Sequence, residues 1–217
     1  MSLLNFSAFK EFAELSYWRW VKFFNKDLSN THYKFFFTEY FDLPESFYNQ
    51  KLIMDIGCGP RGSLEWADMA KERYGLDPLA DAYKKMGTGK HKMEYIKSYV
   101  EKIPFPDAHF DIISSFNSLD HVENLEAACN EIIRVLKPGA YFLLIVDIHN
   151  YPTFTEPQIM SWGKVEGLFP GMNWLSKKRL DNVVKGRIYK NLRIGKIKKE
   201  TDKSNGVLTA ILQKPID

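Results

Sequence analysis

The chain of 217 residues has little cysteine, little net charge and no long apolar run. Its two cysteines, Cys58 and Cys129, have no metal-type spacing and are too few to staple a domain of this size, so we expect reduced thiols in a cytoplasmic protein. No apolar run approaches the roughly 20 residues that span a bilayer. The first residues lack the basic stretch and apolar core of a secretory signal. With 45% hydrophobic residues, these features predict a single globular domain, without a membrane span or a metal.

The most informative segment is residues 51–62. An apolar run, Leu52–Ile56, leads directly into a turn that contains Gly57, Gly59 and Gly62. This pattern predicts a buried strand, a tight turn and a helix. Glycine permits positive φ angles and lets a ligand approach bare main chain. In open α/β sheets, units of this kind bind nucleotides.

Asp55, two residues before the first glycine, narrows the choice of ligand. The spacing of Gly57, Gly59 and Gly62 is that of a dinucleotide-binding turn, but alone this is a weak signal. A carboxylate here would repel a pyrophosphate and attract an ammonium or sulfonium group. S-adenosylmethionine (SAM) carries both cations. The alternative is a turn that only packs a helix on the strand.

Strand and helix patterns alternate along residues 51–150, which predicts a mostly parallel sheet with helices on both faces. The expected strands are Leu52–Ile56, Tyr74–Asp77, Met93–Tyr99, Phe110–Phe116 and Ala140–Ile148. The expected helices are Leu64–Arg73, Pro78–Lys85 and Leu125–Leu136. Beyond residue 150 we expect a helix over Glu156–Leu168 and an antiparallel hairpin of Arg187–Lys198 with Val207–Lys214, turning near Asn205-Gly206.

Residues 1–50 are rich in aromatic side chains, of which the first group, Phe6–Phe24, has roughly helical spacing. A second helix is expected from near Asn30 to near Asp42. We expect this segment to cover a ligand cleft as a lid, with four candidates, namely Trp18, Trp20, Tyr33 and Phe37. The alternative is that both helices only pack against the edge of the sheet.

Three further motifs follow in order. Asp77 ends the second predicted strand, where an acid can accept hydrogen bonds from ribose hydroxyls. Next come Ile103-Pro104-Phe105-Pro106-Asp107 before Phe110-Asp111, and then Leu136-Lys137-Pro138-Gly139-Ala140. With the glycine turn, these motifs resemble the class I SAM-dependent methyltransferases, closest to the small-molecule branch called type 11, over about residues 50–150. The resemblance implies a Rossmann-like α/β fold with a seven-stranded, mostly parallel sheet.

The resemblance also implies SAM as cofactor, S-adenosylhomocysteine as product, and a set of cofactor-binding residues. Asp55, Gly57 and Gly59 would hold the methionyl part, with Cys58 as a small side chain beside it, and Asp77 would bind the ribose. Val100 would meet adenine through its N–H, with Glu101 nearby. Pro78, Leu79 and Asn117 complete the expected set. Tyr99 stands where many relatives carry an Asp, so either Glu101 binds the adenine amino group or Tyr99 stacks on the base.

Two histidines are candidates for a general base, because imidazole titrates near neutral pH. His121 follows the predicted strand Phe110–Phe116, and His149 follows Ala140–Ile148. The alternative for His121 is a packing or capping role. The loop after Phe116 lacks the Asn/Asp-Pro-Pro-aromatic motif that nucleic-acid amino-methyltransferases share, which argues against that chemistry.

The leading hypothesis is transfer of the sulfonium methyl to a small or medium-sized acceptor oxygen, nitrogen or carbon by in-line displacement. A catalytically silent SAM-binding or RNA-binding partner protein is the alternative, because residues 176–203 hold eleven Lys or Arg and three acids. The other interpretation of this basic stretch is a solvated outer face of the C-terminal strands, and we do not favour nucleic-acid binding. A nicotinamide-dependent dehydrogenase is a third hypothesis, which Asp55 disfavours.

Overall fold

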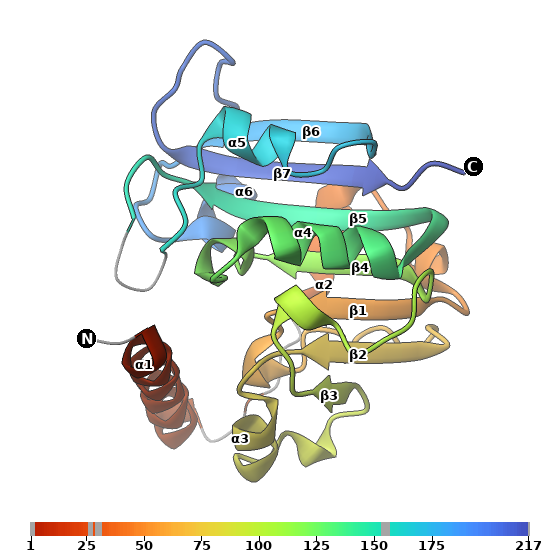
Figure 1. Ribbon diagram of the computed structural model, residues 1–217, viewed down its shortest axis with the longest axis vertical. Helices are drawn as coiled ribbons and strands as arrows, with labels where there is room; N and C mark the ends of the chain where they lie inside the picture. The colour runs from red at the N-terminus through yellow and green to blue at the C-terminus, as the bar shows by residue number, and fades with distance from the viewer. Residues whose placement is uncertain (1–2, 26–27, 29–31, 153–156, 217) are drawn as a thin grey trace.

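A seven-stranded sheet forms the centre of the computed structural model, which describes residues 3–25, 28, 32–152 and 157–216. The strand order is β3-β2-β1-β4-β5-β7-β6 (Figure 1). The strands are β1 (Leu52–Ile56), β2 (Glu72–Leu76), β3 (Glu94–Ile96), β4 (Phe110–Phe116), β5 (Leu136–Ile148), β6 (Asn173–Asp181) and β7 (Gly206–Gln213). The first five strands are mutually parallel, and β7 is antiparallel to both of its neighbours. The predicted Rossmann-like α/β fold is therefore confirmed.

The sheet is covered on both faces. The helices are α1 (Leu3–Asn25), α2 (Lys34–Phe37), α3 (Ala80–Lys85), α4 (Leu125–Val135), α5 (Trp162–Gly167) and α6 (Ile188–Ile194). One apolar cluster joins α4 and α5 to the sheet through residues such as Ile132, Phe142 and Phe169. The other joins the N-terminal segment and α3 to the opposite face. Among the described residues, no helix is long and apolar enough to cross a membrane.

The topology places a crevice at the carboxyl ends of β1 and β4. From β1 the chain moves outward to β2 and β3, then returns to the other side of β1 to form β4. At such a reversal the loops after two neighbouring strands diverge, and ligands bind between them. In Figure 1, α1 lies past this edge of the sheet.

Several predicted elements match the structure closely. The strands β1 and β4 have the predicted bounds, and β7 is shifted by one residue. The helix α4 ends one residue earlier than expected, just before the Lys137-Pro138-Gly139 stop. Its start is capped by Asn124, whose side chain accepts the N–H of Ala127.

The predicted helix Leu64–Arg73 is wrong. A short 3-10 helix, Gly59–Arg61, is followed by turns that lead directly into β2. The Arg73 guanidinium explains this conformation, because it donates to the carbonyls of Leu64 and Glu65, at 3.2 and 3.1 Å. A helix would need both carbonyls for its own ladder.

The predicted hairpin is also wrong in its first strand. The partner of β7 is β6, and Arg187–Lys198 instead contains α6. Leu192 is buried, four residues after the half-buried Ile188, which is helical rather than strand spacing. Gly195 ends α6 in a left-handed conformation, with φ 65°. The predicted helix Glu156–Leu168 is shorter than expected, because α5 begins after the Ser161 cap, and residues 153–156 lie outside the described residues.

The aromatic N-terminal segment supplies much of the second apolar cluster. After α2 come two short 3-10 helices, Glu39–Phe41 and Glu45–Tyr48. Phe37 is fully buried, with its ring 4.6 Å from that of Phe116 and 5.5 Å from that of Trp66. Phe37 is therefore a core residue rather than part of a lid. The expected helix start at Asn30 lies outside the described residues.

Replacing Phe37 by Ala tests this core assignment. We expect Phe37→Ala to lower the free energy of unfolding by about 3–5 kcal/mol, because the buried ring has no other side chain to replace it. The exposed Trp20 is the matched control, and Trp20→Ala should leave stability nearly unchanged. Urea denaturation of both variants gives the comparison. Unchanged stability of Phe37→Ala would contradict the assignment.

Candidate functional site

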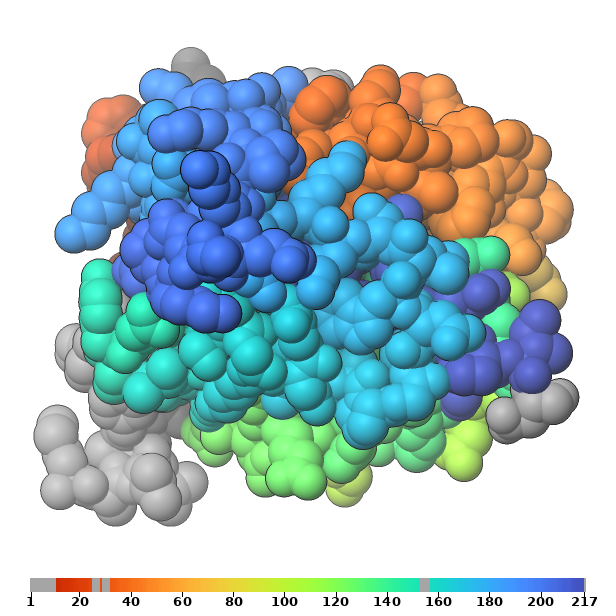
Figure 2. Space-filling model, turned by 90° about the horizontal axis from the view of Figure 1, so that it is seen from above, coloured from red at the N-terminus to blue at the C-terminus, as the bar shows by residue number. Residues whose placement is uncertain are grey.

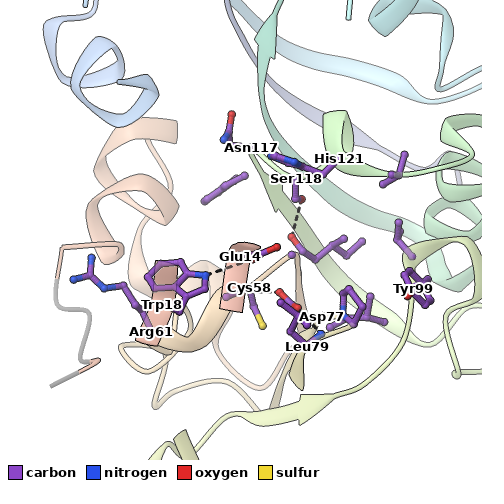
Figure 3. Close-up of a pocket in the computed structure, with 18 of the residues that line it drawn as sticks. Glu14, Trp18, Cys58, Arg61, Asp77, Leu79, Tyr99, Asn117, Ser118 and His121 are labelled. Atoms are coloured by element: carbon purple, nitrogen blue, oxygen red, sulfur yellow. Dashed lines mark hydrogen bonds between the residues drawn. The ribbon is translucent and has the colours of Figure 1, made fainter. Parts of the chain in front are cut away.

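A cavity of about 600 Å³ opens at the carboxyl ends of β1, β2 and β4 (Figure 3). Twelve of the predicted site residues line it, namely Trp18, Tyr33, Gly57, Cys58, Gly59, Asp77, Pro78, Leu79, Val100, Glu101, Asn117 and His121. Four others do not line it, namely Trp20, Phe37, Asp55 and His149. The sequence motifs therefore converge on one cavity, whose size is typical of small-molecule sites.

The glycine turn forms the floor of the cavity. Gly57 and Gly59 have φ angles of 67° and 57°, which favour glycine. A Cβ atom on Gly57 would lie 2.3 Å from the Cβ of Ser118, so the loops after β1 and β4 touch here. Ser118 also donates its hydroxyl to the carbonyl of Ile56, at 2.9 Å. The bare main chain keeps the space above the turn open.

Asp77 lies at the end of β2 and is 4% exposed. Its two carboxylate oxygens accept the N–H groups of Gly59 and Leu79, at 3.1 and 2.9 Å. Burial, together with the negative charge of Glu14, raises the pKa of Asp77 to about 7 despite these bonds. Asp77 is therefore a poorly solvated acceptor at the wall of the cavity.

Asp55 lies behind the turn rather than in the cavity. Successive side chains of a strand point to opposite faces, and the neighbouring Ile56 takes the lining position. The Asp55 carboxylate accepts the hydroxyls of Ser114 and Ser63, at 2.6 and 2.5 Å. Burial raises the pKa of Asp55 to about 6, although the hydrogen bonds from the two hydroxyls act in the opposite direction. The Asp55 carboxylate thus shapes the turn from behind, and the expectation that Asp55, Gly57 and Gly59 hold the methionyl part of SAM through backbone groups and a water stays a prediction.

Two acids of α1 face the cavity, and the sequence analysis missed both. Glu14 accepts the phenol of Tyr83 at 3.0 Å and the indole N–H of Trp18 at 3.4 Å. Glu11 accepts the phenol of Tyr99 at 2.5 Å. The available signal was their spacing, since residues three and four apart share one helix face. Both acids line the cavity, and Glu14 lies near Asp77 (Figure 3).

Tyr99 and Glu101, the two alternatives for the adenine contact, differ in their present partners. Glu101 accepts the N–H groups of Glu123 and Asn124 with one oxygen, at 2.9 and 3.1 Å. That oxygen is therefore engaged in holding the loop before α4. Tyr99 lies at the cavity wall beside Val100 and is 49% exposed. Both residues line the cavity, so which of them meets adenine stays a prediction.

The two candidate bases differ in position. His121 lines the cavity, with its Nε2 atom 3.8 Å from a carboxylate oxygen of the buried Asp120. His149 is buried outside it, and its Nδ1 atom lies 2.7 Å from the carbonyl of Tyr151. His149 pairs with Met160 in an isolated bridge, which fixes its backbone beyond the end of β5. Of these two candidates His121 is the one at the cavity, which His32 of the N-terminal segment also lines.

Aromatic and basic residues from distant segments complete the wall. Tyr33 contacts Tyr189 of α6, with ring centroids 5.3 Å apart. Arg61, Arg187 and Phe116 also line the cavity, and Arg187 and Tyr189 were missed because their segment was predicted to be a strand. Among the described residues, no group of three or more His, Cys, Asp or Glu side chains is placed to hold a metal.

Comparison with known families agrees with this geometry. Residues 54–144 match the family described as methyltransferase domain, type 11. These residues are similar to a class I SAM-dependent methyltransferase domain. The matched residues extend from β1 into β5 and include the glycine turn, Asp77 and His121.

Curated relatives match the methyltransferase domain over part of their length. A malonyl-[acyl-carrier protein] O-methyltransferase of Enterobacter lignolyticus is 28% identical over 138 residues, 62% of this chain and 53% of the relative. A ubiquinone/menaquinone biosynthesis C-methyltransferase of Pseudomonas putida is 35% identical over 89 residues, 40% of this chain and 33% of the relative. The chain thus spans between a third and a half of the length of these relatives.

Solved structures share the fold of the domain. A SAM-dependent methyltransferase from Mesorhizobium loti has a TM-score of 0.60 and 16% identity, covering 79% of this chain and 94% of that one. The [4+2]-cyclase SpnF has a TM-score of 0.59 and 17% identity, covering 78% and 76%. At this level of identity the likeness shows the fold alone.

The buried Asp55 gives a prediction about pH and stability. Its folded-state pKa of about 6 lies above its ordinary value of 3.8, so its contribution to stability is complete below about pH 4 and is lost as pH rises through 6. Asp55→Asn keeps two hydrogen-bonding groups, since serine hydroxyls also accept. We expect the variant to be more stable than wild type at pH 8 by on the order of 1–3 kcal/mol.

Urea unfolding of ligand-free protein at pH 4.5 and pH 8 measures this difference. The gain should shrink toward zero at the lower pH. Asp81→Asn, at an exposed position, is the matched control and should show no such pH dependence. If Asp55→Asn instead lowers the free energy of unfolding at pH 8, by as much as at pH 4.5 or by more, the folded protein stabilises the charge of Asp55.

Proposed function

We propose that this protein is a SAM-dependent methyltransferase that acts on a small or medium-sized acceptor in the cavity. The observation that carries the proposal is the position of Asp77, a buried acceptor beside the open glycine turn, within a domain of this family. A strand-end acid at this place is suited to a ribose with two hydroxyl donors.

The residues fit SAM as cofactor. A side chain on Gly57 would collide with Ser118, so the turn leaves main chain exposed to the ligand. Asp77, Glu14 and Glu11 give the inner cavity acidic character, which suits a cationic ligand. Leu79 and Val100 supply apolar surface for a base. When bound, SAM supplies a methyl group activated by its sulfonium centre.

The remaining lining residues act on the acceptor. Trp18, Tyr33 and Tyr189 exclude water and restrict the orientations that an acceptor can take, which favours displacement. His121 takes the proton of an acceptor that carries one, because it is the histidine at the cavity beyond β4. The helix α1 covers the adenosine side as a lid, held by Glu11 and Glu14 on Tyr99 and Tyr83.

Calorimetric titration of SAM and S-adenosylhomocysteine tests the cofactor. We expect affinity to rise about tenfold per pH unit up to about pH 7 and then level off, because ribose hydroxyls donate to ionised Asp77. Asp77→Asn should weaken binding by on the order of 10- to 100-fold at pH 8. The variant should also lose the pH dependence.

Three comparisons sharpen this titration. Glu14→Gln removes a negative charge that raises the pKa of Asp77, so it should move the pH midpoint downward. Asp81→Asn alters an exposed carboxylate on α3 and should bind like wild type. NAD is the ligand control. Absence of SAM binding by folded wild-type protein would refute the proposal, and binding of NAD instead would indicate a dehydrogenase.

His121 gives a separate prediction once an acceptor with an ionisable proton is in hand. We expect His121→Gln to lower kcat about 100-fold or more with a small change in KM, because glutamine cannot take the proton of the acceptor. His149→Gln, outside the cavity, should leave kcat close to that of wild type. Full activity of His121→Gln would remove the proposed base.

A further inference from the structure

The outward face of α1 is aromatic. Phe12, Tyr17, Trp20, Phe23 and Phe24 are exposed, from 57% for Tyr17 to 79% for Phe23. Trp20, Phe23 and Phe24 are three and four residues apart, so they share one side of the helix. Their rings also contact one another, with centroids 4.9 Å apart for Trp20 and Phe24 and 5.3 Å for Phe23 and Phe24. We call these five exposed side chains the α1 aromatic face; Trp20, Phe23 and Phe24 form its contiguous part, and Tyr17 lies where it borders the cavity.

The inward side of the same helix carries both apolar and polar contacts. Val21 is buried there, and Leu15 and Trp18 pack against the core. Glu11, Glu14 and Lys22 bond to Tyr99, to Tyr83 and to the carbonyl of Met86. An amphipathic helix of a globular protein ordinarily turns its apolar side to the core. Among the described side chains of α1, only Leu15, Trp18 and Val21 make that core contact, and the large exposed aromatic rings face outward. A patch of this kind marks an interaction surface.

Uncompensated positive charge lies around α6. Several basic residues of the 176–203 stretch are paired, for example Arg179 with Glu166 and Lys198 with Asp181. In contrast, Lys185, Arg187, Lys190 and Arg193 are exposed and make no ion pair within the described part of the chain. Arg187, Lys190 and Arg193 are spaced by three residues along the helix. We call these four side chains the α6 basic cluster.

Both surfaces border the same cavity. Tyr17 and Trp18 of α1 and Arg187 and Tyr189 of the α6 segment line it together. In Figure 2 the blue segment around α6 forms a continuous raised surface, with red atoms of α1 at its rim. An object that covers the mouth of the cavity would therefore meet aromatic rings on one side and cations on the other.

We propose that α1 and the α6 basic cluster dock the protein on an anionic lipid surface, and that an apolar acceptor enters the cavity from that surface. The docking claim depends only on the exposed side chains of α1 and α6. The claim about the acceptor rests on the proposed function. Tryptophan, tyrosine and phenylalanine insert at the level of lipid headgroups, and lysine or arginine beside them binds anionic lipid.

Charge complementarity favours an anionic lipid surface over a second copy of the chain. A second copy of the chain would bring another set of unpaired cations against the first, which costs energy unless acids face them. An anionic lipid surface neutralises the α6 basic cluster and also accepts the α1 aromatic face in its apolar layer. Each Lys or Arg near such a surface contributes about 1 kcal/mol.

Co-sedimentation with vesicles tests the proposal without any cofactor, so its outcome is independent of SAM binding. We expect wild-type protein to bind vesicles of phosphatidylcholine with 30% phosphatidylglycerol at least tenfold more tightly than phosphatidylcholine alone. Phe23→Glu with Phe24→Glu, and separately Lys185→Glu with Lys190→Glu, should each lower this binding about tenfold or more. Lipids brominated on their acyl chains should quench the fluorescence of Trp20, and Trp20→Phe should lose that quenching.

Two controls lie at the far end of the sheet. Leu175→Glu alters an exposed apolar residue on β6, and Lys71→Glu alters an exposed lysine before β2, so both should bind vesicles like wild type. Equal binding by all variants, or none by wild type at low salt, would overturn the proposal. Dimerisation lost in Phe23→Glu with Phe24→Glu, or salt-sensitive RNA binding without vesicle binding, would assign the surface to those partners instead.

Discussion

The site depends on carboxylates that are kept out of water at the ends of β1 and β2. Asp55 and Asp77 are each 4% exposed, and burial raises the pKa of both. Such groups are costly unless their oxygens are satisfied. Ser63 and Ser114 satisfy Asp55 from behind the turn, and the N–H groups of Gly59 and Leu79 satisfy Asp77 from within it. The turn is held in shape by these bonds, and its glycines leave the space above it open.

The second constraint is the short connection between β1 and β2. With turns in place of a helix over residues 62–71, one face of the sheet needs another cover. The segment from α2 to Tyr48 supplies it with buried rings, and Phe37 and Tyr48 both contact Trp66 from that connection. The aromatic richness of the N-terminal residues therefore serves two purposes. Residues 33–48 complete the core, and α1 is left free to lie over the cavity.

Sequence reasoning found the residues whose role is set by local pattern. The glycine turn, Asp77 and the bounds of β1 and β4 follow from an apolar run that ends in a turn, and this pattern is readable along the chain. It could not find the position of Asp55, because the direction of a side chain depends on the pleat and on Ser114 of the neighbouring strand. Sequence reasoning also missed α6, because its Ile and Arg residues do not indicate a helix. Asn191 stabilises this helix through hydrogen bonds to Val184 and Asn182.

Glu11 and Glu14 show what long-range packing adds. From the sequence of α1 alone, Glu11 and Glu14 are expected to be solvated charges. In the folded protein, hydrogen bonds from Tyr99 and Tyr83 hold them at the cavity. The resulting charge distribution is directional: Glu14 lies near the buried Asp77, and the exposed Arg187 lines the cavity from the α6 segment. A cationic ligand is favoured inside and an anionic surface outside, so the two do not compete for one place. Fold alone does not determine chemistry. The physical argument for the proposals is therefore this separation of charge, rather than the likeness to solved structures. It links the inner cavity to the proposed cofactor and the mouth of the cavity to the proposed source of the acceptor.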